Sequence, residues 1–575
     1  MLKSNAFNRN SKNGGAFGID LGTTNSCISV VGNDGVSRTI PLEEGGSIMP
    51  SCVLWDGNKN KFIVGKEAYN QRYKTNACYS VKTLMGSDEI VHFKHGKKEI
   101  TKTPVEVSSI ILRALVDKVA YAYPNIKDVV ITVPAAFNTK QIEDTRKAAE
   151  LADLNVLSII KEPTAASLAY RLDSDENKTV LVYDLGGGTF DVSLVTIQVN
   201  KSGDTSDLFD VLGINDDVSD SGDDKTIVTV KDTKGNPHLG GDDLDKEMLR
   251  LFFERAKKQG LNPDLVSKVD KEKLLLKLES YKKKLDKLVG FNINLDLQLT
   301  DGSRFTDTVL FNSEDFIKAT KFIYNKTKEY ITGILDSSKV GVDTIVLIGG
   351  STKNPELQRL IRKDFPNTQV CDYLFADEAV SLGAAINAKR VKYGSEDLEV
   401  FDVISQNIGV VADGRVAPII QKGSSIPCTA SKVLATVVDN QSQASIEIYE
   451  GANLYPEKCT YLGNLIVNDL PKGKAGSIAI TIYLTVDVNG LLTIEVDSGK
   501  QKKEKATLVN VLGKKTVNDD NSTASIMFNK WYSYANSLQD EKERETLLNL
   551  IDQARVEPNK KANVVKYIRE LSENA

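Results

Sequence analysis

Apolar runs alternate with amphipathic segments over the first two thirds of the chain. Between residue 16 and about residue 392, short strand-like runs such as 129–133 precede helix-like segments such as 139–152. This alternation is typical of a layered α/β domain, because each strand and helix buries one side against the next layer. Residues 201–224 interrupt the pattern with an acidic stretch rich in Ser and Gly, and we expect a solvated loop there.

The hydrophobic period changes to two after residue 403. Three runs alternate apolar and polar positions: residues 445–448, 478–484 and 492–496. Each such strand would bury one face, so we predict an antiparallel β sandwich over residues 404–515. The Asn489-Gly490 pair between the last two runs favours a type I′ hairpin turn.

Helical spacing returns in the last part of the chain. Residues 516–575 contain three short amphipathic patterns, which predict a short C-terminal α-helical segment. Residues 395–403 join the α/β part to the sandwich and are expected to form a linker. The polar residues 1–15 lack the apolar core of a secretory signal, and we expect a disordered tail.

Composition narrows the class of protein. The 575 residues include 73 basic and 78 acidic side chains, for a net charge of −5. This balance gives no electrostatic case for binding nucleic acid or an anionic membrane. No apolar run is long enough for a membrane span, and six scattered cysteines without a CxxC pair indicate reduced thiols. We therefore expect a cytoplasmic protein with neither nucleic acid nor membrane as partner.

Two segments 164 residues apart have nearly the same sequence pattern. Residues 18–24 read GIDLGTT and residues 183–189 read YDLGGGT, and each is followed by a second apolar run. Glycines at such a strand–turn–strand let backbone N–H groups approach an anion closely. Threonine hydroxyls can donate to phosphate oxygens, and carboxylates can hold the waters of Mg²⁺. The repeat predicts a duplicated domain that closes on a polyphosphate from two sides.

Six segments of the chain, the two above among them, resemble the conserved segments of one protein family. They are residues 17–31, 130–135, 162–166, 180–194, 238–243 and 345–355. Together they resemble the actin, sugar-kinase and heat-shock ATPase superfamily, and specifically the DnaK (heat shock protein 70) chaperones. The resemblance runs from about Phe17 to about Asp497. It implies an actin-like α/β ATPase domain of two ribonuclease-H-like halves over residues 16–394, and a peptide-binding sandwich after the linker.

The resemblance also implies a site that hydrolyses ATP to ADP. The catalytic residues implied are Asp20, Lys82, Glu162, Thr189 and Asp191, and two of them, Asp20 and Asp191, would also hold Mg²⁺. Lys82 would orient the attacking water and offset charge beside the γ-phosphate, because phosphoryl transfer depends mainly on positioning and charge neutralisation. K⁺ is a further candidate cation.

The nucleotide-binding residues implied by the resemblance are Gly22, Thr23, Thr24, Asn25, Asp184, Gly186, Gly187, Gly188, Glu279, Lys282, Lys283, Asp286, Gly349, Gly350, Ser351, Lys353 and Asp377. Two of these depart from the family pattern. Asp286 replaces a small hydroxyl residue, and Lys353 replaces an arginine that stacks on adenine, for which a lysine lacks the planar group.

For the sandwich, the resemblance implies a cleft for extended apolar peptides of unfolded client proteins. Its implied residues are Val410, Ala412, Leu434, Val437, Ala444 and Ile446, and a simple core role stays open for each of them. A J-domain co-chaperone and a nucleotide-exchange factor are the other partners implied. The short helical segment resembles the specialised bacterial branch with a reduced lid, so we expect fast peptide release.

Coupling between the two parts is implied for Pro134, Leu398, Val400, Phe401 and Asp402. Ile142 stands where the family has a surface arginine that relays ATP binding. Glu399 stands where the linker is otherwise apolar. Burying that carboxylate would cost on the order of several kcal/mol unless it is paired or stays at the water edge. Alternatively Glu399 faces solvent and its apolar neighbours make the contact.

Two other functions, each from a different class of protein, are alternatives to a chaperone. A small-molecule kinase or a filament-forming ATPase of the same superfamily would need no appended sandwich. A nucleotide-gated scaffold would bind ATP and barely hydrolyse it. The linker, sandwich and helices that follow residue 394 favour an ATP-driven chaperone over both.

Overall fold

The computed structural model describes residues 15–171, 176–200, 225–284, 290–372, 376–394, 398–412, 414–499 and 504–507, with six separate residues beyond them. The expected N-terminal tail up to residue 14, the acidic stretch 201–224 and nearly all of the predicted helical segment lie outside this description. Among the helices of the described ranges, none combines the length and apolar character needed to cross a bilayer.

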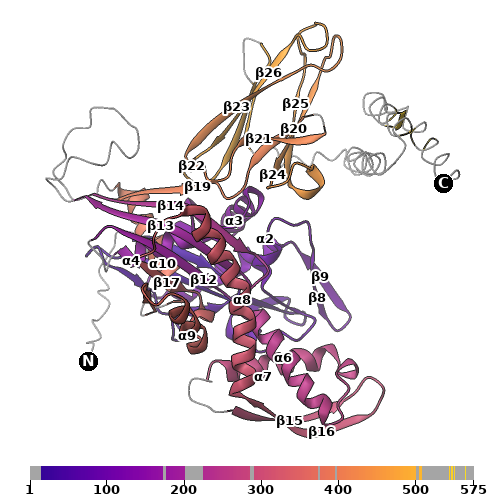
Figure 1. The fold of residues 1–575 in the computed structure, drawn as a ribbon. Coiled ribbons are helices and arrows are strands. Elements are labelled where there is room, and N and C mark those ends of the chain that lie inside the picture. The colour runs from indigo at the N-terminus through magenta and orange to yellow at the C-terminus, as the bar shows by residue number, and fades with distance from the viewer. Residues whose placement is uncertain are drawn as a thin grey trace. The chain divides into compact units, whose positions relative to one another are not determined.

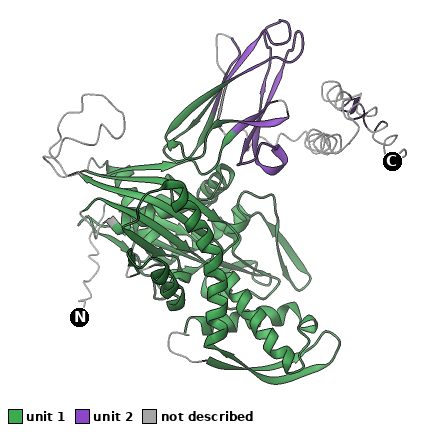
Figure 2. Cartoon of the chain, in the orientation of Figure 1, with its two compact units in different colours: residues 1–408, 418–432, 483–493 green, residues 409–417, 433–482, 494–575 purple. Residues whose placement is uncertain are grey.

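The chain divides into two compact units (Figure 2). Unit 1 comprises residues 1–408, 418–432 and 483–493, and unit 2 comprises residues 409–417, 433–482 and 494–575. Every residue of the nucleotide site discussed below belongs to unit 1, and so does the linker strand.

Unit 1 is built on two large sheets (Figure 1). The first has the order β11 (Asn155–Lys161), β10 (Asp128–Val133), β1 (Ala16–Leu21), β2 (Asn25–Val31), β3 (Ser37–Thr39), with β4 (Ile48–Pro50) paired to β2. The second begins with β18 (Gln369–Cys371), β17 (Thr344–Ile348), β12 (Lys178–Leu185), β13 (Phe190–Asn200), β14 (Lys225–Asn236) and continues with β19 (Leu398–Val403) and β22 (Ser425–Ile426).

The two sheets repeat one plan. In each, a central strand pairs in parallel with a strand that comes later in the chain, and in antiparallel with the strand that directly follows it. The outer strands continue these directions on both sides. The duplication expected from the two similar segments is therefore present in strand order and direction.

The helices of unit 1 are α1 (Lys66–Tyr69), α2 (Pro104–Val119), α3 (Thr139–Leu151), α4 (Glu162–Arg171), α6 (Gly241–Lys258), α7 (Lys268–Lys282), α8 (Ser313–Ser338), α9 (Pro355–Asp364) and α10 (Ala379–Tyr393). Capping boxes begin α2 at Thr103 and α3 at Asn138, where the side chain accepts from the backbone three residues on. The predicted strand 129–133 and helix 139–152 match β10 and α3 within one residue.

Smaller sheets form the outer lobes of unit 1. They are β6 (Lys61–Val64), β5 (Cys52–Asp56) and β7 (Ala77–Tyr79); β8 (Val91–His95) with β9 (Lys98–Lys102); and β15 (Gly290–Gln298) with β16 (Arg304–Asn312). A 3₁₀ helix, η1 (Val81–Leu84), follows β7, and another, η4 (Gly350–Lys353), follows β17. These short helices place Lys82 and Ser351.

Small residues lie where helices α4 and α10 contact each other, in the core shared by the two large sheets. One cluster of buried residues takes side chains from strands of both sheets and from α4 and α10, with alanines such as Ala165, Ala166, Ala384 and Ala385 at the helix contact. Small side chains allow the two helix backbones to approach closely, so this contact fixes how the two halves of the repeat are joined.

The chain beyond residue 404 forms two four-stranded sheets. One has the order β21 (Arg415–Ile420), β20 (Ile408–Ala412), β24 (Ala444–Glu450), β25 (Thr460–Val467); the other has the order β23 (Cys428–Ala435), β26 (Ala479–Val486), β27 (Leu492–Asp497), β28 (Glu504–Thr507). Buried and half-buried positions alternate along β26 and β27, as the period-two pattern predicts.

The predicted type I′ turn between β26 and β27 is wrong. Only Gly490 of the pair has a positive φ, of 74°, and Asn489 does not. The Gly490 N–H donates to the Asp487 carbonyl at 3.0 Å, and the Asp487 N–H donates to the Leu491 carbonyl at 3.1 Å. This three-residue loop with a left-handed glycine is the next commonest hairpin connection, and its glycine satisfies the same sequence signal.

Candidate nucleotide site

Two loops at matching positions of the repeat face one another. Gly22, Thr23 and Thr24 join β1 to β2, and residues 186–189 join β12 to β13. A Cβ on Gly187 would lie 1.6 Å from the Thr24 hydroxyl oxygen, so the absence of a side chain there lets the loops touch. Residues 186–188 are all glycines, so no side chain of theirs would hinder an anion that approaches their backbone.

Four carboxylates and one lysine gather beside these loops. The Lys82 ammonium donates to Glu162, and both side chains are less than a tenth exposed. Asp20 accepts from the Thr132 hydroxyl at 3.0 Å. Asp184 and Asp191 lie directly opposite each other on β12 and β13. The structure thus brings together the three predicted catalytic acids, Asp20, Glu162 and Asp191, and the predicted nucleotide-binding residue Asp184, although the four come from separate segments.

The electrostatics of this cluster show a surplus of negative charge. Burial and the nearby Glu162 carboxylate raise the pKa of Asp20 to about 7, and the same two causes raise the pKa of Asp191 to about 7. Burial, with Glu162 and Asp191 close by, raises the pKa of Asp184 well above its ordinary value. Burial alone would lower the pKa of Lys82, but Glu162 and Asp20 raise it above its ordinary value.

This surplus fits a hydrated divalent cation. The Oδ1 atom of Asp191 is buried without a hydrogen-bond partner, whereas buried polar atoms are normally satisfied. Within the described ranges no three His, Cys, Asp or Glu side chains lie close enough to ligate an ion together. Mg²⁺ usually keeps several of its waters and takes only one or two carboxylates. Asp20 and Asp191 therefore suit Mg²⁺ held largely through water.

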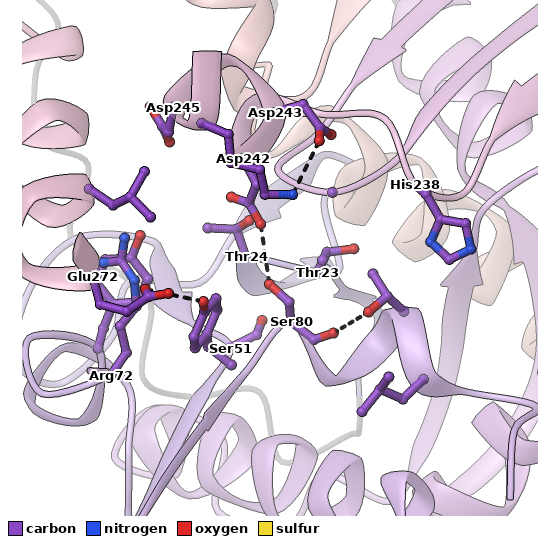
Figure 3. Close-up of a pocket in the computed structure, with 17 residues that line it drawn as sticks. Thr23, Thr24, Ser51, Arg72, Ser80, His238, Asp242, Asp243, Asp245 and Glu272 are labelled. Carbon is purple, nitrogen blue, oxygen red and sulfur yellow. Dashed lines mark hydrogen bonds and ion pairs between the residues drawn. The ribbon is translucent and has the colours of Figure 1, made fainter. Parts of the chain in front are cut away.

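A cavity of about 380 Å³ opens beside the first loop (Figure 3). Its lining includes Thr23, Thr24 and Gly188 from the two loops, and Asp242 and Asp245 from the first turns of α6. Burial and the neighbouring Asp245 raise the pKa of Asp242 to about 6. The volume of the cavity is in the range of small-molecule sites, and the polar side chains that line it suit a charged, hydrated ligand.

The predicted adenosine segments converge on one carbonyl of the second loop. The Gly186 carbonyl accepts from the Gly241 N–H and from the Ser351 hydroxyl, both at 2.9 Å. Lys282 reaches the same neighbourhood, since its ammonium lies 2.8 Å from Asp245 and 3.4 Å from the Gly241 carbonyl. Residues of η4 and α6 thus contact the second loop directly, and α7 contacts α6 through Lys282.

Glu279 already has three donors. Its carboxylate accepts from the Tyr69 hydroxyl at 2.6 Å, from Arg72 at 2.9 Å and from Lys283 at 2.7 Å. Despite burial, which acts in the opposite direction, these groups lower the pKa of Glu279 to about 2. Arg72 follows α1 and itself lines the cavity, so this ion pair joins α7 to the segment after α1 at the cavity wall.

Of the remaining predicted nucleotide residues, Lys353 forms an ion pair with Asp377. Gly349 is the N-cap of η4, and Gly350 is its first residue. Asn25 is the first residue of β2. Asp286 lies outside the described residues, so the departure at that position stays a prediction.

Residues 398–403 of the predicted linker form the strand β19, which pairs in parallel with β14 and in antiparallel with β22. Leu398 is buried, and Val400 packs against the core cluster that contains α4 and α10. Glu399 is two-fifths exposed, and its carboxylate lies 2.7 Å from the Lys225 ammonium of β14. The Glu399 carboxylate is therefore both paired and partly exposed to solvent, and under either condition its desolvation would destabilise the docked linker little.

Pro134 follows β10 directly and begins a turn next to Asp191. The next residues turn back, with the Phe137 N–H donating to the Pro134 carbonyl at 3.1 Å. The Ala136 backbone favours the ionised form of Asp191 and so acts to lower the pKa of that carboxyl. Ile142 is partly buried against the core of the first sheet, where a guanidinium would find no place among apolar side chains.

The six predicted peptide-contact residues differ widely in exposure. Val410 and Ile446 are fully buried, Ala412, Leu434 and Ala444 are half-buried, and Val437 is 76% exposed. Burial makes a core role for Val410 and Ile446 the simplest description of their side chains, whereas Val437 is available to a ligand.

Three contributors to the site escaped the sequence analysis: Thr132, Arg72 and Lys161. A polar threonine in the middle of the apolar run 129–133 was a usable signal, because a buried hydroxyl needs a partner. Arg72 and Lys161 gave none, since each meets its partner more than 200 residues away in the chain.

Comparison with known proteins agrees with this arrangement. The family model described as "Hsp70 protein" matches residues 16–225 and 208–572. The chain is 33% identical over 529 residues to chaperone protein dnaK1 of Synechocystis sp., covering 87% of this chain and 72% of that protein. It is 31% identical over 505 residues to chaperone protein DnaK of Metamycoplasma hominis, covering 86% and 79%. The chain therefore belongs to the Hsp70 family of ATP-dependent molecular chaperones, which hydrolyse ATP and include the DnaK proteins.

Proposed function

We propose that hydrolysis of Mg²⁺-bound ATP between the two loops sets how tightly the β sheets beyond residue 404 hold an extended apolar peptide. The observation that carries this proposal is the buried cluster of Asp20, Glu162, Asp184 and Asp191 around the single Lys82, placed at the contact of two duplicated glycine-rich loops. Phosphoryl transfer to water needs positioning and charge neutralisation more than covalent chemistry, and this cluster offers both.

Each residue of the cluster has a proposed role. Thr23, Thr24 and the N–H groups of residues 186–189 would bind the β- and γ-phosphates, and Lys82 would offset charge on the γ-phosphate and orient the attacking water. Mg²⁺, held through water by Asp20 and Asp191, would supply further neutralisation of the phosphate oxygens. Glu162 holds the Lys82 ammonium in place and is the group nearest to it that can accept a proton from water.

The wider assignments follow the family. Glu279, Lys282, Lys283, Ser351 and Lys353 would bind adenosine, and the ATPase domain would span residues 16–394 as two ribonuclease-H-like halves. Residues 404–515 would form the peptide-binding sandwich, with Val437 at its exposed rim. A J-domain co-chaperone and a nucleotide-exchange factor are the proposed protein partners, K⁺ is a proposed further cation, and the cytoplasm is the proposed location.

Steady-state ATPase assays test the coupling directly. We expect an extended apolar peptide to raise ATP turnover of the full chain, and a J-domain partner to raise it further. A small-molecule kinase would instead consume ATP only with a phosphate acceptor, which phosphate release and acceptor labelling distinguish. A scaffold without turnover would show no phosphate release under any of these conditions.

Thr189→Ala is expected to leave ATP bound but to slow hydrolysis by about 100-fold, the scale of losing one donor that acts on developing charge. Thr189 is nearly buried in the second loop, and its carbonyl accepts from the Gly186 N–H at 3.1 Å, a bond that alanine keeps. Single-turnover hydrolysis and ATP affinity measure the two effects separately. Hydrolysis at the wild-type rate would show that the second loop does not contact the γ-phosphate.

Glu399→Leu is expected to raise both ATP-induced peptide release and basal ATPase, by up to about fivefold, within the usual range of coupling energies. Leucine replaces a half-exposed ion pair, worth about 1 kcal/mol or less, with apolar surface on a strand whose neighbours Leu398 and Val400 are already docked. Lys225→Ala, which removes the ion pair without adding apolar surface, is the control. If the leucine changes neither quantity, position 399 lies outside the contact that couples the domains.

A further inference from the structure

The second loop, residues 186–189, lies beside a segment that comes much later in the chain. Strands β12 and β17 pair in parallel, with Asp184 opposite Ile348, so the residues that follow the two strands leave the sheet side by side. A Cβ on Gly349 would be 2.4 Å from the Leu185 carbonyl oxygen, and the φ of 82° at Gly349 is one that favours glycine. The helix η4 therefore begins directly against the second loop.

Two carbonyls of this loop accept hydrogen bonds from outside it. The Gly186 carbonyl accepts from the Ser351 hydroxyl and from the Gly241 N–H, both at 2.9 Å. The Gly187 carbonyl accepts from the Asp242 N–H at 2.7 Å. Gly241 and Asp242 are the first two residues of α6. Two of the N–H groups that a helix leaves unpaired at its start are thus used to hold the loop.

These bonds fix the direction of the loop's own N–H groups. In a trans peptide the C=O and N–H bonds of one unit point in opposite directions, and the one cis peptide of the described residues is elsewhere, between Ile426 and Pro427. Because α6 holds the carbonyls of Gly186 and Gly187, the N–H groups of Gly187 and Gly188 point away from α6. Neither N–H donates a hydrogen bond within the described ranges, so both can donate to a ligand.

The hydroxyl of Ser351 is committed to this loop. A serine has one hydroxyl proton to donate, and in Ser351 that proton goes to the Gly186 carbonyl. The space for the hydroxyl depends on Gly241, since a Cβ there would lie 2.3 Å from the Ser351 oxygen. While this bond is made, Ser351 can only accept a hydrogen bond from a nucleotide, and its donor acts on the protein itself.

We propose that Ser351 is a positioning residue of the second loop, whose hydroxyl holds the Gly186 peptide so that the N–H groups beyond it face the phosphates of ATP. This role is separate from the adenosine contact that the resemblance implies for Ser351. It joins the adenosine end of the site to the phosphate end through a single bond. The inference rests on the proposed function, because it requires that the second loop binds the β- and γ-phosphates.

Ser351→Ala in the full-length protein is expected to slow single-turnover hydrolysis of ATP about fivefold, the effect of losing one ordinary hydrogen bond. The affinity for ATP, measured by equilibrium titration, should change less than about twofold. A residue that only held adenosine would do the opposite, because it would bind the substrate and the transition state equally and so alter affinity alone. Ser351→Thr keeps the hydroxyl and should retain most of the wild-type rate.

Gly241→Ala breaks the same bond from the other side. The added Cβ fits if the Ser351 hydroxyl turns away from Gly186, so hydrolysis should slow by about the same factor as in Ser351→Ala. In the double variant the obstructing oxygen is absent, and the rate should be no lower than in Ser351→Ala alone.

Ser338→Ala is the matched control for loss of a serine hydroxyl, and it should leave the rate and the affinity unchanged. Ser338 also donates to a backbone carbonyl, that of Leu335 at 3.3 Å. It ends α8 before the start of β17, whereas the second loop lies beyond the other end of that strand.

The proposal is overturned if Ser351→Ala hydrolyses ATP at the wild-type rate, if it weakens only the affinity for ATP, or if the effects of Ser351→Ala and Gly241→Ala on the rate multiply independently. Should Gly241→Ala fail to fold, as judged by its unfolding transition, the comparison of Ser351→Ala with Ser351→Thr still decides the question. Thr189→Ala keeps this result separate from the proposed function. Normal hydrolysis in Thr189→Ala would remove the proposed role of the second loop itself, whereas slow hydrolysis in Thr189→Ala with normal hydrolysis in Ser351→Ala would remove only the role of Ser351.

Discussion

Lys82→Met is expected to lower ATP hydrolysis by about 1,000-fold or more, the scale seen when a cation that neutralises a transferring phosphoryl group is removed. The Lys82 ammonium forms an ion pair with Glu162, and its charge also acts on Asp20 and Asp184. Methionine keeps the length of the side chain and its packing near Phe137, so the change removes charge with little change of volume.

ATP should still bind to this variant, because the loops that would hold the phosphates are unchanged. Hydrolysis is measured in single turnover, and ATP affinity is measured by equilibrium titration. Lys127→Met serves as the matched control for loss of a lysine on the same domain. Hydrolysis within tenfold of wild type would mean that Lys82 is a structural partner of Glu162 and does not act on the γ-phosphate.

The parts of the site that sequence reasoning predicted share a physical cause. Asp20 with Gly22–Thr24, and Asp184 with residues 186–189, are local strand–turn–strand patterns, so their chemistry is readable within about ten residues. The duplication then implied that both loops serve one ligand, and the repeated strand order agrees with this. Pattern and turn chemistry were sufficient because every residue needed is adjacent in the chain.

The parts that could not be predicted depend on contacts between distant segments. Nothing in the sequence around Glu399 indicates that its ion-pair partner is Lys225, because the pair forms only when the linker adds to β14. The sequence around Glu279 likewise does not indicate that its carboxylate accepts hydrogen bonds from Tyr69 and Arg72. Sequence showed which residues are polar and unusual, and only the fold showed which of them neutralise one another.

The hairpin near Asn489 shows a limit of a different kind. Asn-Gly is a strong signal for a tight turn, and a tight turn is present. The loop nevertheless adopts one more residue and a different geometry, because Asp487 accepts from both Asn489 and Leu491 through its side chain. A local motif restricts the turn type without choosing among close alternatives.

Gly383→Ala is expected to destabilise the ATPase part of the chain by more than about 4 kcal/mol, at the far end of what single substitutions do. Gly383 lies in α10, and a Cβ there would be 1.7 Å from the carbonyl oxygen of Ala165 in α4. The obstacle is backbone, which cannot move aside without separating the helices that join the two sheets.

Helix propensity alone predicts the opposite sign for this substitution. Alanine is favoured over glycine inside a helix by roughly 1 kcal/mol, so a free helix would be stabilised. Gly333→Ala in α8 is the matched control, since its Cβ would meet only the end of the flexible Lys234 side chain, at 2.9 Å. We expect Gly333→Ala to be neutral or stabilising, and Gly383→Ala to unfold at much lower denaturant and lose ATPase activity with it. Equal unfolding midpoints for the two variants would mean that α4 and α10 can separate at little cost, and that their close contact does not fix the two halves of the nucleotide site.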